Sequence, residues 1–178
     1  EVMMRGTFAN IRIKNEMAPG TEGGFTKLYP EGNVMSVYSA VEEYKKRGTD
    51  LAVIGGKEYG TGSSRDWAAK GTKLLGVKVV IAESFERIHR SNLIGMGVLP
   101  LQFINKMNRI NLNLIGSELI TILEIEKGIN ASDEVTVEIK YASGDIKKIQ
   151  TLCRIDTNNE LEYYKNGGIL QYVLRNMI

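Results

Sequence analysis

Short apolar runs and amphipathic segments alternate in the middle of the chain. The apolar runs cover residues 51–54, 77–82 and 98–103. The two segments between them carry apolar residues at helical spacing: the first starts at Ser63 or Arg65 and ends at Leu75, and the second covers residues 85–93. This alternation predicts a βαβ series with parallel strands and right-handed crossovers. Because ligands of such sheets bind beyond the carboxyl ends of the strands, we expect the chemistry in the connections that follow each strand.

The residues before this series have a different pattern. Residues 6–13 have extended, strand-like character, whereas residues 18–33 are rich in turn residues and are predicted to form a loop. Ser36 is a suitable N-cap for a helix over residues 37–47. We therefore expect an extended segment, a loop and one helix ahead of the first apolar run.

Alternating apolar and polar residues predominate later in the chain. This pattern over 118–125, 134–140 and 146–154 predicts β-hairpins, and a helical pattern over 160–177, interrupted by two glycines, comes after it. Pro100 lies inside the third apolar run, so that run is predicted to form an edge or terminal strand. The expected fold class is α/β, with a short parallel sheet, flanking helices and a β-hairpin-rich C-terminal part.

Composition narrows the possible functions. A length of 178 residues with 43% hydrophobic residues suits a single domain over 1–178 with a real core. The net charge of +2 is too small to argue for nucleic acid or an anionic membrane, and no run approaches the roughly 18 apolar residues of a membrane span. The chain has no initiator methionine and no signal-peptide layout, so we expect it to be a fragment of a longer chain.

Cys153 is the only cysteine and His89 the only histidine. No disulfide can form within the chain, which fits a reducing compartment such as the cytoplasm. A zinc or iron–sulfur site needs several such ligands, so we expect no metal held by this chain alone. Cys153 lies in an alternating run and is expected to be a buried structural thiol, and a structural or surface role is expected for His89.

Candidate binding and catalytic groups are concentrated in residues 58–69, shortly after the first apolar run. This stretch combines a glycine-rich turn with the first turn of a predicted helix, where unpaired N–H groups and the helix dipole favour an anion. Arg65 adds a planar fork suited to a carboxylate, and Ser63 and Ser64 place hydroxyl groups beside it. The sequence predicts a pocket for a small carboxylate or phosphate, with a serine positioned for proton chemistry.

A purely structural interpretation of this stretch is also open. Ser63 and Asp66 fit a capping box, and the glycines could serve only the turn geometry. The spacing excludes an ordinary P-loop and gives no dinucleotide fingerprint. Trp67 is expected to pack in the core. Glu83 and Ser84 come directly after the next strand and therefore fall at the same edge of the sheet.

Several blocks of the sequence resemble the aconitase family. The blocks are residues 5–12, 58–69, 80–93, 95–101, 153–156 and 163–170. Their order covers essentially the whole chain and is similar to the C-terminal, swivelling domain of the bacterial aconitase A and cytoplasmic aconitase/iron-regulatory protein branch. The resemblance implies a swivelling β/β/α domain.

The resemblance also implies an activity. Such enzymes are hydro-lyases that interconvert citrate and isocitrate through cis-aconitate, with a [4Fe–4S] cluster held by domains that this chain lacks. By motif position, Ser63 resembles the catalytic base, Ser64 and Arg65 resemble a substrate-binding pair, and Arg5 resembles an arginine that grips a substrate carboxylate. The implied partners are the tricarboxylate substrate and the cluster-bearing domains, and the isolated chain is expected to be inactive.

Three alternatives stay open. A dehydratase acting on 2-methylcitrate or 2-methylisocitrate would use the same serine and arginines. The small subunit of isopropylmalate dehydratase shares the fold and a Gly-Ser-Ser-Arg loop, although the longer Glu-Tyr-Gly-Thr-Gly form here favours aconitase. Iron-regulatory proteins suggest RNA binding by the cluster-free parent protein, which the scattered basic residues and modest charge support only weakly.

Overall fold

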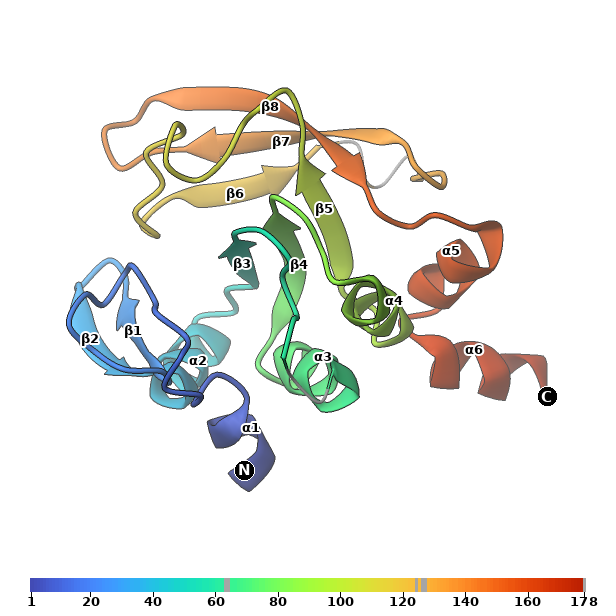
Figure 1. The fold of residues 1–178 in the computed structure, drawn as a ribbon, viewed down its shortest axis with the longest axis horizontal. Helices are drawn as coiled ribbons and strands as arrows, with labels where there is room; N and C mark the ends of the chain where they lie inside the picture. Colours follow the sequence, from blue (N-terminus) through green and yellow to red (C-terminus); the bar gives the residue numbers. More distant parts are fainter. Residues whose placement is uncertain (63–64, 124, 126–127, 178) are drawn as a thin grey trace.

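The computed structural model describes residues 1–62, 65–123, 125 and 128–177. Figure 1 shows the strands β6, β7 and β8 as a layer across the top of the view, above the helices α2, α3 and α4. In chain order the elements are α1 (Val2–Gly6), β1 (Phe25–Leu28), β2 (Asn33–Ser36), α2 (Val37–Lys46), β3 (Leu51–Gly55), α3 (Arg65–Leu74), β4 (Val77–Ala82), α4 (Arg87–Gly95), β5 (Leu99–Phe103), β6 (Leu119–Ile122), β7 (Glu134–Lys140), β8 (Ile146–Cys153), α5 (Asn158–Lys165) and α6 (Ile169–Asn176).

A six-stranded mixed sheet organises the molecule, with strand order β3-β4-β5-β8-β7-β6. The strands β3, β4 and β5 are parallel, and β8, β7 and β6 continue the sheet in antiparallel pairs. Because α3 joins β3 to β4 and α4 joins β4 to β5, the predicted βαβ series is confirmed. The α/β class, with its short parallel sheet and hairpin-rich C-terminal part, is confirmed as well.

The hydrophobic core lies on both faces of the sheet. Val79 and Ile81 of β4 belong to a large cluster that includes side chains of β5, β7 and β8. Val80 and Ala82 belong to a second cluster, shared with α3 and α4. Successive side chains of a strand point to opposite faces, so β4 is buried on both sides from Val79 to Ala82, and this part of its sequence is a continuous apolar run. The second cluster therefore packs α3 and α4 against the strands that lead into the predicted site.

Two expectations about the N-terminal part are wrong. Residues 6–13 form no strand: α1 ends at Gly6 and turns come after it, with the Asn10 side chain accepting a hydrogen bond from the Arg12 N–H at 2.9 Å. An asparagine that bonds the backbone two residues on favours a turn over a strand. Residues 18–33 are not only loop, because β1 lies within them and pairs with β2 as an antiparallel hairpin. The four-residue strand β1 is too short to stand out among turn residues.

The expected edge position of the strand containing Pro100 is also wrong. β5 lies inside the sheet, between β4 and β8. Its ladder with β8 begins at Leu101, which pairs with Cys153, and the Pro100 carbonyl accepts a hydrogen bond from the Arg154 N–H at 2.9 Å just before it. Pro100 thus falls outside the ladder with β8, although it is the partner of Val80 in the ladder with β4, and an inner strand can tolerate it at this end.

The N-cap predicted at Ser36 is confirmed. Ser36 precedes α2, and its Oγ accepts a hydrogen bond from the Ser39 N–H at 3.0 Å. Gly76 lies just after α3 with a φ of +83°, a conformation that glycine adopts without steric cost. The helical tail consists of α5 and α6, which are separated by the two glycines. None of the helices in the described part of the chain is long and apolar enough to cross a membrane.

Candidate functional site

The glycine-rich connection between β3 and α3 lies at the carboxyl end of the parallel strands, as predicted. Among its described residues, Glu58, Gly60 and Gly62 have positive φ angles of 52°, 98° and 80°. Glycine accepts such angles readily, whereas a residue with a side chain adopts them at a cost. Glu58 is therefore the position at which this loop is strained.

Backbone hydrogen bonds join this loop to the connection between β4 and α4. The Gly56 carbonyl accepts from the Glu83 N–H at 3.1 Å. The Tyr59 N–H donates to the Ser84 carbonyl at 3.0 Å, and the Tyr59 carbonyl accepts from the Glu86 N–H at 2.9 Å. The loop is thus held along one side by main-chain groups of its neighbour.

The side chain of Tyr59 packs beneath the loop. Its ring meets Phe85 edge-on, with ring centroids 6.1 Å apart, and lies 5.4 Å from the His89 ring. Burial raises the pKa of the Tyr59 hydroxyl, so the phenol stays protonated at neutral pH. A Cβ at Gly55 would lie 2.7 Å from the Tyr59 ring, and a Cβ at Gly60 would overlap His89. The two glycines allow the backbone to lie directly on these rings.

The hydroxyl of Ser84 also reaches the loop. Its Oγ accepts a hydrogen bond from the Glu58 N–H at 2.8 Å and lies 3.4 Å from the Glu58 carboxylate. The Thr61 hydroxyl donates to the Glu58 carbonyl at 2.8 Å. Both polar groups of the strained Glu58 backbone are therefore satisfied. The sequence indicated that Ser84 lies at this edge of the sheet, but gave no sign of this contact.

Arg109 is a cation at this edge that the sequence did not indicate. It donates to the Glu16 carboxylate at 2.5 and 3.0 Å, and its Nη1 lies 3.4 Å from the Glu83 carboxylate. The hydrogen bonds from Arg109 hold the pKa of Glu16 below its usual value. A Cβ at Gly56 would lie 3.8 Å from this guanidinium, so Arg109 adjoins the start of the loop. It lies after β5 in an irregular segment with no recognisable spacing.

Arg5 lies on α1, against α2. Its guanidinium carbon is 4.0 Å from the centre of the Tyr38 ring, and Nη2 is 3.6 Å from the Glu1 carboxylate. The Tyr38 hydroxyl donates to the same carboxylate at 2.7 Å. α1 also approaches α3 closely, because a Cβ at Gly71 would overlap the Thr7 side chain. The structure thus brings the helix that carries Arg5 against the helix that comes after the glycine loop.

The other predicted site residues are placed only in part. Ser63 and Ser64 lie outside the described residues, and so does the predicted cap formed by Ser63. Arg65 is the first residue of α3, which is one of the two predicted starts of this helix; the other, Ser63, is not described. Trp67 does not pack in the core as expected: 54% of it is exposed, and the Lys70 ammonium lies 5.5 Å from its ring centre.

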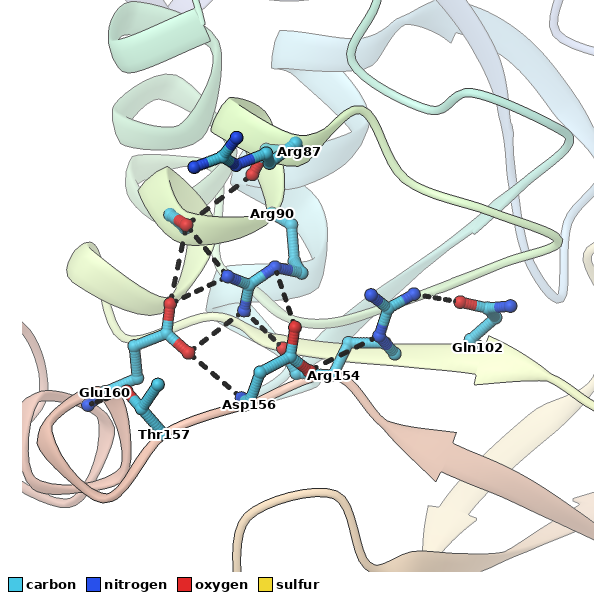
Figure 2. A network of polar contacts seen from close by, with 8 residues as sticks. Arg87, Arg90, Gln102, Arg154, Asp156, Thr157 and Glu160 are labelled. Atoms are coloured by element: carbon cyan, nitrogen blue, oxygen red, sulfur yellow. Dashed lines mark hydrogen bonds and ion pairs between the residues drawn. The ribbon is translucent and has the colours of Figure 1, made fainter.

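An ion cluster around the buried Arg90 ties α4 to α5 and to the segment that precedes α5 (Figure 2). Arg90 donates to both carboxylate oxygens of Glu160, at 2.8 and 3.0 Å, and to the Arg154 carbonyl at 2.7 Å. Its Nε lies 3.5 Å from the Asp156 carboxylate. Partial burial alone would raise the pKa of Glu160, but hydrogen bonds from Arg90 and the Asp156 N–H outweigh burial and lower it. The Gln102 side chain accepts a hydrogen bond from Arg154, which extends the cluster to β5.

Comparison with known proteins places the chain in a family. Residues 1–106 match the family described as the aconitase C-terminal domain. The chain is 67% identical over 175 residues to an aconitate hydratase A of Legionella pneumophila, and 58% identical over 178 residues to that of Escherichia coli; these alignments cover 98% and 100% of this chain and 20% of each relative. The chain therefore belongs to the aconitase C-terminal domain family. It spans about a fifth of the length of these relatives.

A solved structure gives a more distant likeness. It is a 3-isopropylmalate dehydratase from Methanocaldococcus jannaschii, with a TM-score of 0.44 and 22% identity, covering 78% of this chain and 73% of that one. A likeness at this level says nothing about function.

The residues of this chain do not fit a metal cluster. Among the described residues, no three histidine, cysteine, aspartate or glutamate side chains are grouped so as to hold a metal ion. Cys153, the only cysteine in the sequence, is fully buried in β8, and burial raises the pKa of its thiol. A buried, protonated thiol is a structural group, in agreement with the prediction for Cys153.

Proposed function

We propose that this chain is the part of an aconitate hydratase that supplies the catalytic base and the carboxylate contacts. The proposed reaction interconverts citrate and isocitrate through cis-aconitate. The observation that carries the proposal is the 67% identity to aconitate hydratase A over 98% of the chain. The position of the glycine loop at the carboxyl end of the parallel strands supports it.

Ser63 is the proposed base. In the dehydration of citrate, it takes the proton from the carbon next to a carboxylate, the electron pair of that C–H bond becomes the double bond of cis-aconitate, and the hydroxyl group on the neighbouring carbon departs. A serine hydroxyl is a weak base at neutral pH and needs positive potential to act as an alkoxide. The N-terminal end of α3, which begins at Arg65, supplies such a potential at this point of the chain.

The substrate contacts are proposed for Ser64, Arg65 and Arg5. A tricarboxylate presents several anionic groups, and the guanidinium fork matches a carboxylate at two points. Arg5 already lies 3.6 Å from the Glu1 carboxylate. A substrate carboxylate would take the place of this exposed partner, because surface ion pairs contribute only about 0–1 kcal/mol.

The [4Fe–4S] cluster of the family is proposed to be held by the rest of the parent enzyme. This chain has one cysteine, so it cannot provide the several thiolates that such a cluster requires. The chain's own contribution is to bind the carboxylates and to carry the proton. A cytoplasmic location is part of the same proposal.

The test is the hydration of cis-aconitate by the full-length parent enzyme carrying its cluster. The Ser63→Ala variant should lose turnover by about 100-fold to 10,000-fold, while the KM changes little, because only proton transfer is removed. Ser143→Ala is the control, since Ser143 lies in the β7–β8 turn and bonds Asp145. Near-normal turnover of Ser63→Ala would reduce Ser63 to a helix cap.

The same assay decides between related substrates. The native parent enzyme should turn over cis-aconitate with a higher kcat/KM than 2-methyl-cis-aconitate. The reverse ratio would replace the aconitate hydratase proposal by a methylcitrate-type dehydratase that uses the same serine and arginines.

A further inference from the structure

We propose that Ser84 is a positioning residue for the glycine loop: its hydroxyl oxygen holds Glu58 in a left-handed conformation and so fixes the path of the chain toward Ser63. The inference rests on the proposed function of Ser63 as the base. Ser84 acts through the loop, in the connection between β4 and α4, and is not a catalytic residue.

Glu58 is strained and therefore needs a restraint. A φ of +52° is sparsely populated for a residue with a side chain, and such conformations persist only where the surroundings hold them. The hydrogen bond from the Glu58 N–H to Ser84 Oγ, at 2.8 Å, is such a restraint. It fixes the peptide orientation at the one strained position of the described loop that is not a glycine.

The main-chain hydrogen bonds of the loop do not replace this restraint. The peptide group after Glu58 is held by main-chain bonds, because its carbonyl accepts from the Thr61 N–H at 3.1 Å and the Tyr59 N–H donates to the Ser84 carbonyl. The peptide group before Glu58 carries the N–H that Ser84 Oγ binds, and its rotation sets the φ angle of Glu58. Ser84 Oγ restrains this rotation from 26 residues further along the chain.

The residues after Glu58 depend on the direction in which the chain leaves it. Gly60 and Gly62 both have positive φ angles, and glycine permits many alternative conformations at such positions. The backbone at Gly60 packs on the His89 ring, and this contact limits how far the loop can move toward that ring. The hydrogen bond at Glu58 also fixes the direction in which the backbone leaves this residue. A change in that direction would move the residues that follow Glu58 together.

The hydrogen bond lies in an exposed position, which separates positioning from stability. If Ser84 loses its hydroxyl, water can bond the Glu58 N–H, so the folded state should lose little stability. Water cannot hold the left-handed conformation, however. If Ser84 has a purely structural role, its loss should lower stability and leave kcat unchanged. If Ser84 is a positioning residue, its loss should lower kcat and leave stability almost unchanged.

The kinetic test uses the full-length, cluster-loaded enzyme with Ser84→Ala, Ser84→Thr and the control Ser143→Ala. We expect Ser84→Ala to lower kcat for cis-aconitate hydration by about 10-fold to 100-fold, with the KM within about twofold and the melting temperature almost unchanged. Ser84→Thr keeps the oxygen and should restore most of the turnover. A kcat within twofold of the native value in Ser84→Ala would overturn the proposal.

A second measurement does not depend on activity. Amide hydrogen exchange of peptides that cover residues 57–62 should become about 10-fold faster in Ser84→Ala of the same enzyme and should stay native in Ser84→Thr. Unchanged exchange in Ser84→Ala would overturn the proposal even if kcat fell. If Ser63→Ala kept its turnover, the proposed function would fail, while the exchange result would still decide whether Ser84 holds the loop.

Discussion

Arg90 shows most clearly how a single residue can be both buried and charged in this molecule. Its side chain is only 10% exposed, and that of its partner Glu160 only 16%. A charge taken from water is costly unless hydrogen bonds and an opposite charge compensate it. The two-point contact with Glu160 and the bond to the Arg154 carbonyl supply this compensation. The partner Glu160 lies 70 residues further along the chain, so local sequence patterns cannot indicate this pair.

Arg90→Met tests this balance. We expect the free energy of unfolding to fall by about 3–5 kcal/mol, because Glu160 would keep its buried charge without its cation. Urea unfolding of the chain measures the change. Arg47→Met is the matched control: Arg47 makes a similar pair with Glu31, but the two side chains are 34% and 43% exposed, so a loss of at most about 1 kcal/mol is expected. Equal losses in the two variants would contradict the role given to burial.

The loop glycines offer a second comparison between single residues. Gly60→Ala adds both a strained φ and an overlap with His89, whereas Gly62→Ala adds a strained φ with nothing within 4 Å of the new atom. We expect losses in unfolding free energy of about 2–4 kcal/mol and about 1–2 kcal/mol, respectively. The difference between the two variants, measured by urea unfolding, isolates the packing of the loop on the ring. A difference near zero would show that the loop can move away from His89.

Elements that are determined by residues close together in sequence could be predicted, whereas features that depend on contacts between distant parts of the chain could not. The strands β3 and β4, and the helices α2, α3 and α4, are encoded by periodicity and by caps within a few residues. The inner position of β5 depends on β8, which lies about 50 residues further along the chain and pairs with it at Leu101 and Cys153. In the candidate site, the loop and its edge of the sheet were predicted from the motif. Arg109 was not, because its partners Glu16 and Glu83 are brought together only by the tertiary fold.

The contact between α1 and α3 tests how one element is placed by another. Gly71→Ala puts a methyl group into the Thr7 side chain, so we expect overpacking to cost about 1–3 kcal/mol and to displace the helix that carries Arg5. Adding Thr7→Gly should restore much of that loss. Gly95→Ala is the control, since a Cβ there has nothing within 4 Å. Urea unfolding of the single and double variants measures the effect, and an unrelieved loss in the double variant would contradict the contact.

At the scale of the whole molecule, acid should weaken the attachment of the C-terminal helices. The pKa of Glu160 is lowered from its ordinary value of 4.5 in the folded state. The unfolded chain therefore binds more protons below that pH, and the stability that Glu160 contributes is present above about pH 4.5 and is lost as the pH falls through the folded-state pKa.

We accordingly expect the unfolding free energy of the native chain to decline as the pH falls below about 4.5, and Glu160→Gln to show a shallower decline. Arg90→Met should flatten the profile in the same way, because it removes the cation that lowers the pKa. Urea unfolding at a series of pH values measures the slopes. Parallel profiles for the native chain and Glu160→Gln would show that other carboxylates dominate the acid response.

The pairing of β5 with β8 joins two parts of the molecule that meet different structural requirements. The family match ends at residue 106, shortly after β5, so it includes the glycine loop, the Ser84 connection and α4 but none of the strands β6, β7 and β8. On the far side of the join, the hairpin offers a matching ladder and packs Val137, Ile139 and Ile149 into the core cluster of β4 and β5, and Glu160 of α5 supplies the carboxylate for Arg90. Laboratory recombination should therefore tolerate exchange of the hairpin only where its ladder with β5 and its core side chains are kept, and should fail where it disturbs the loop.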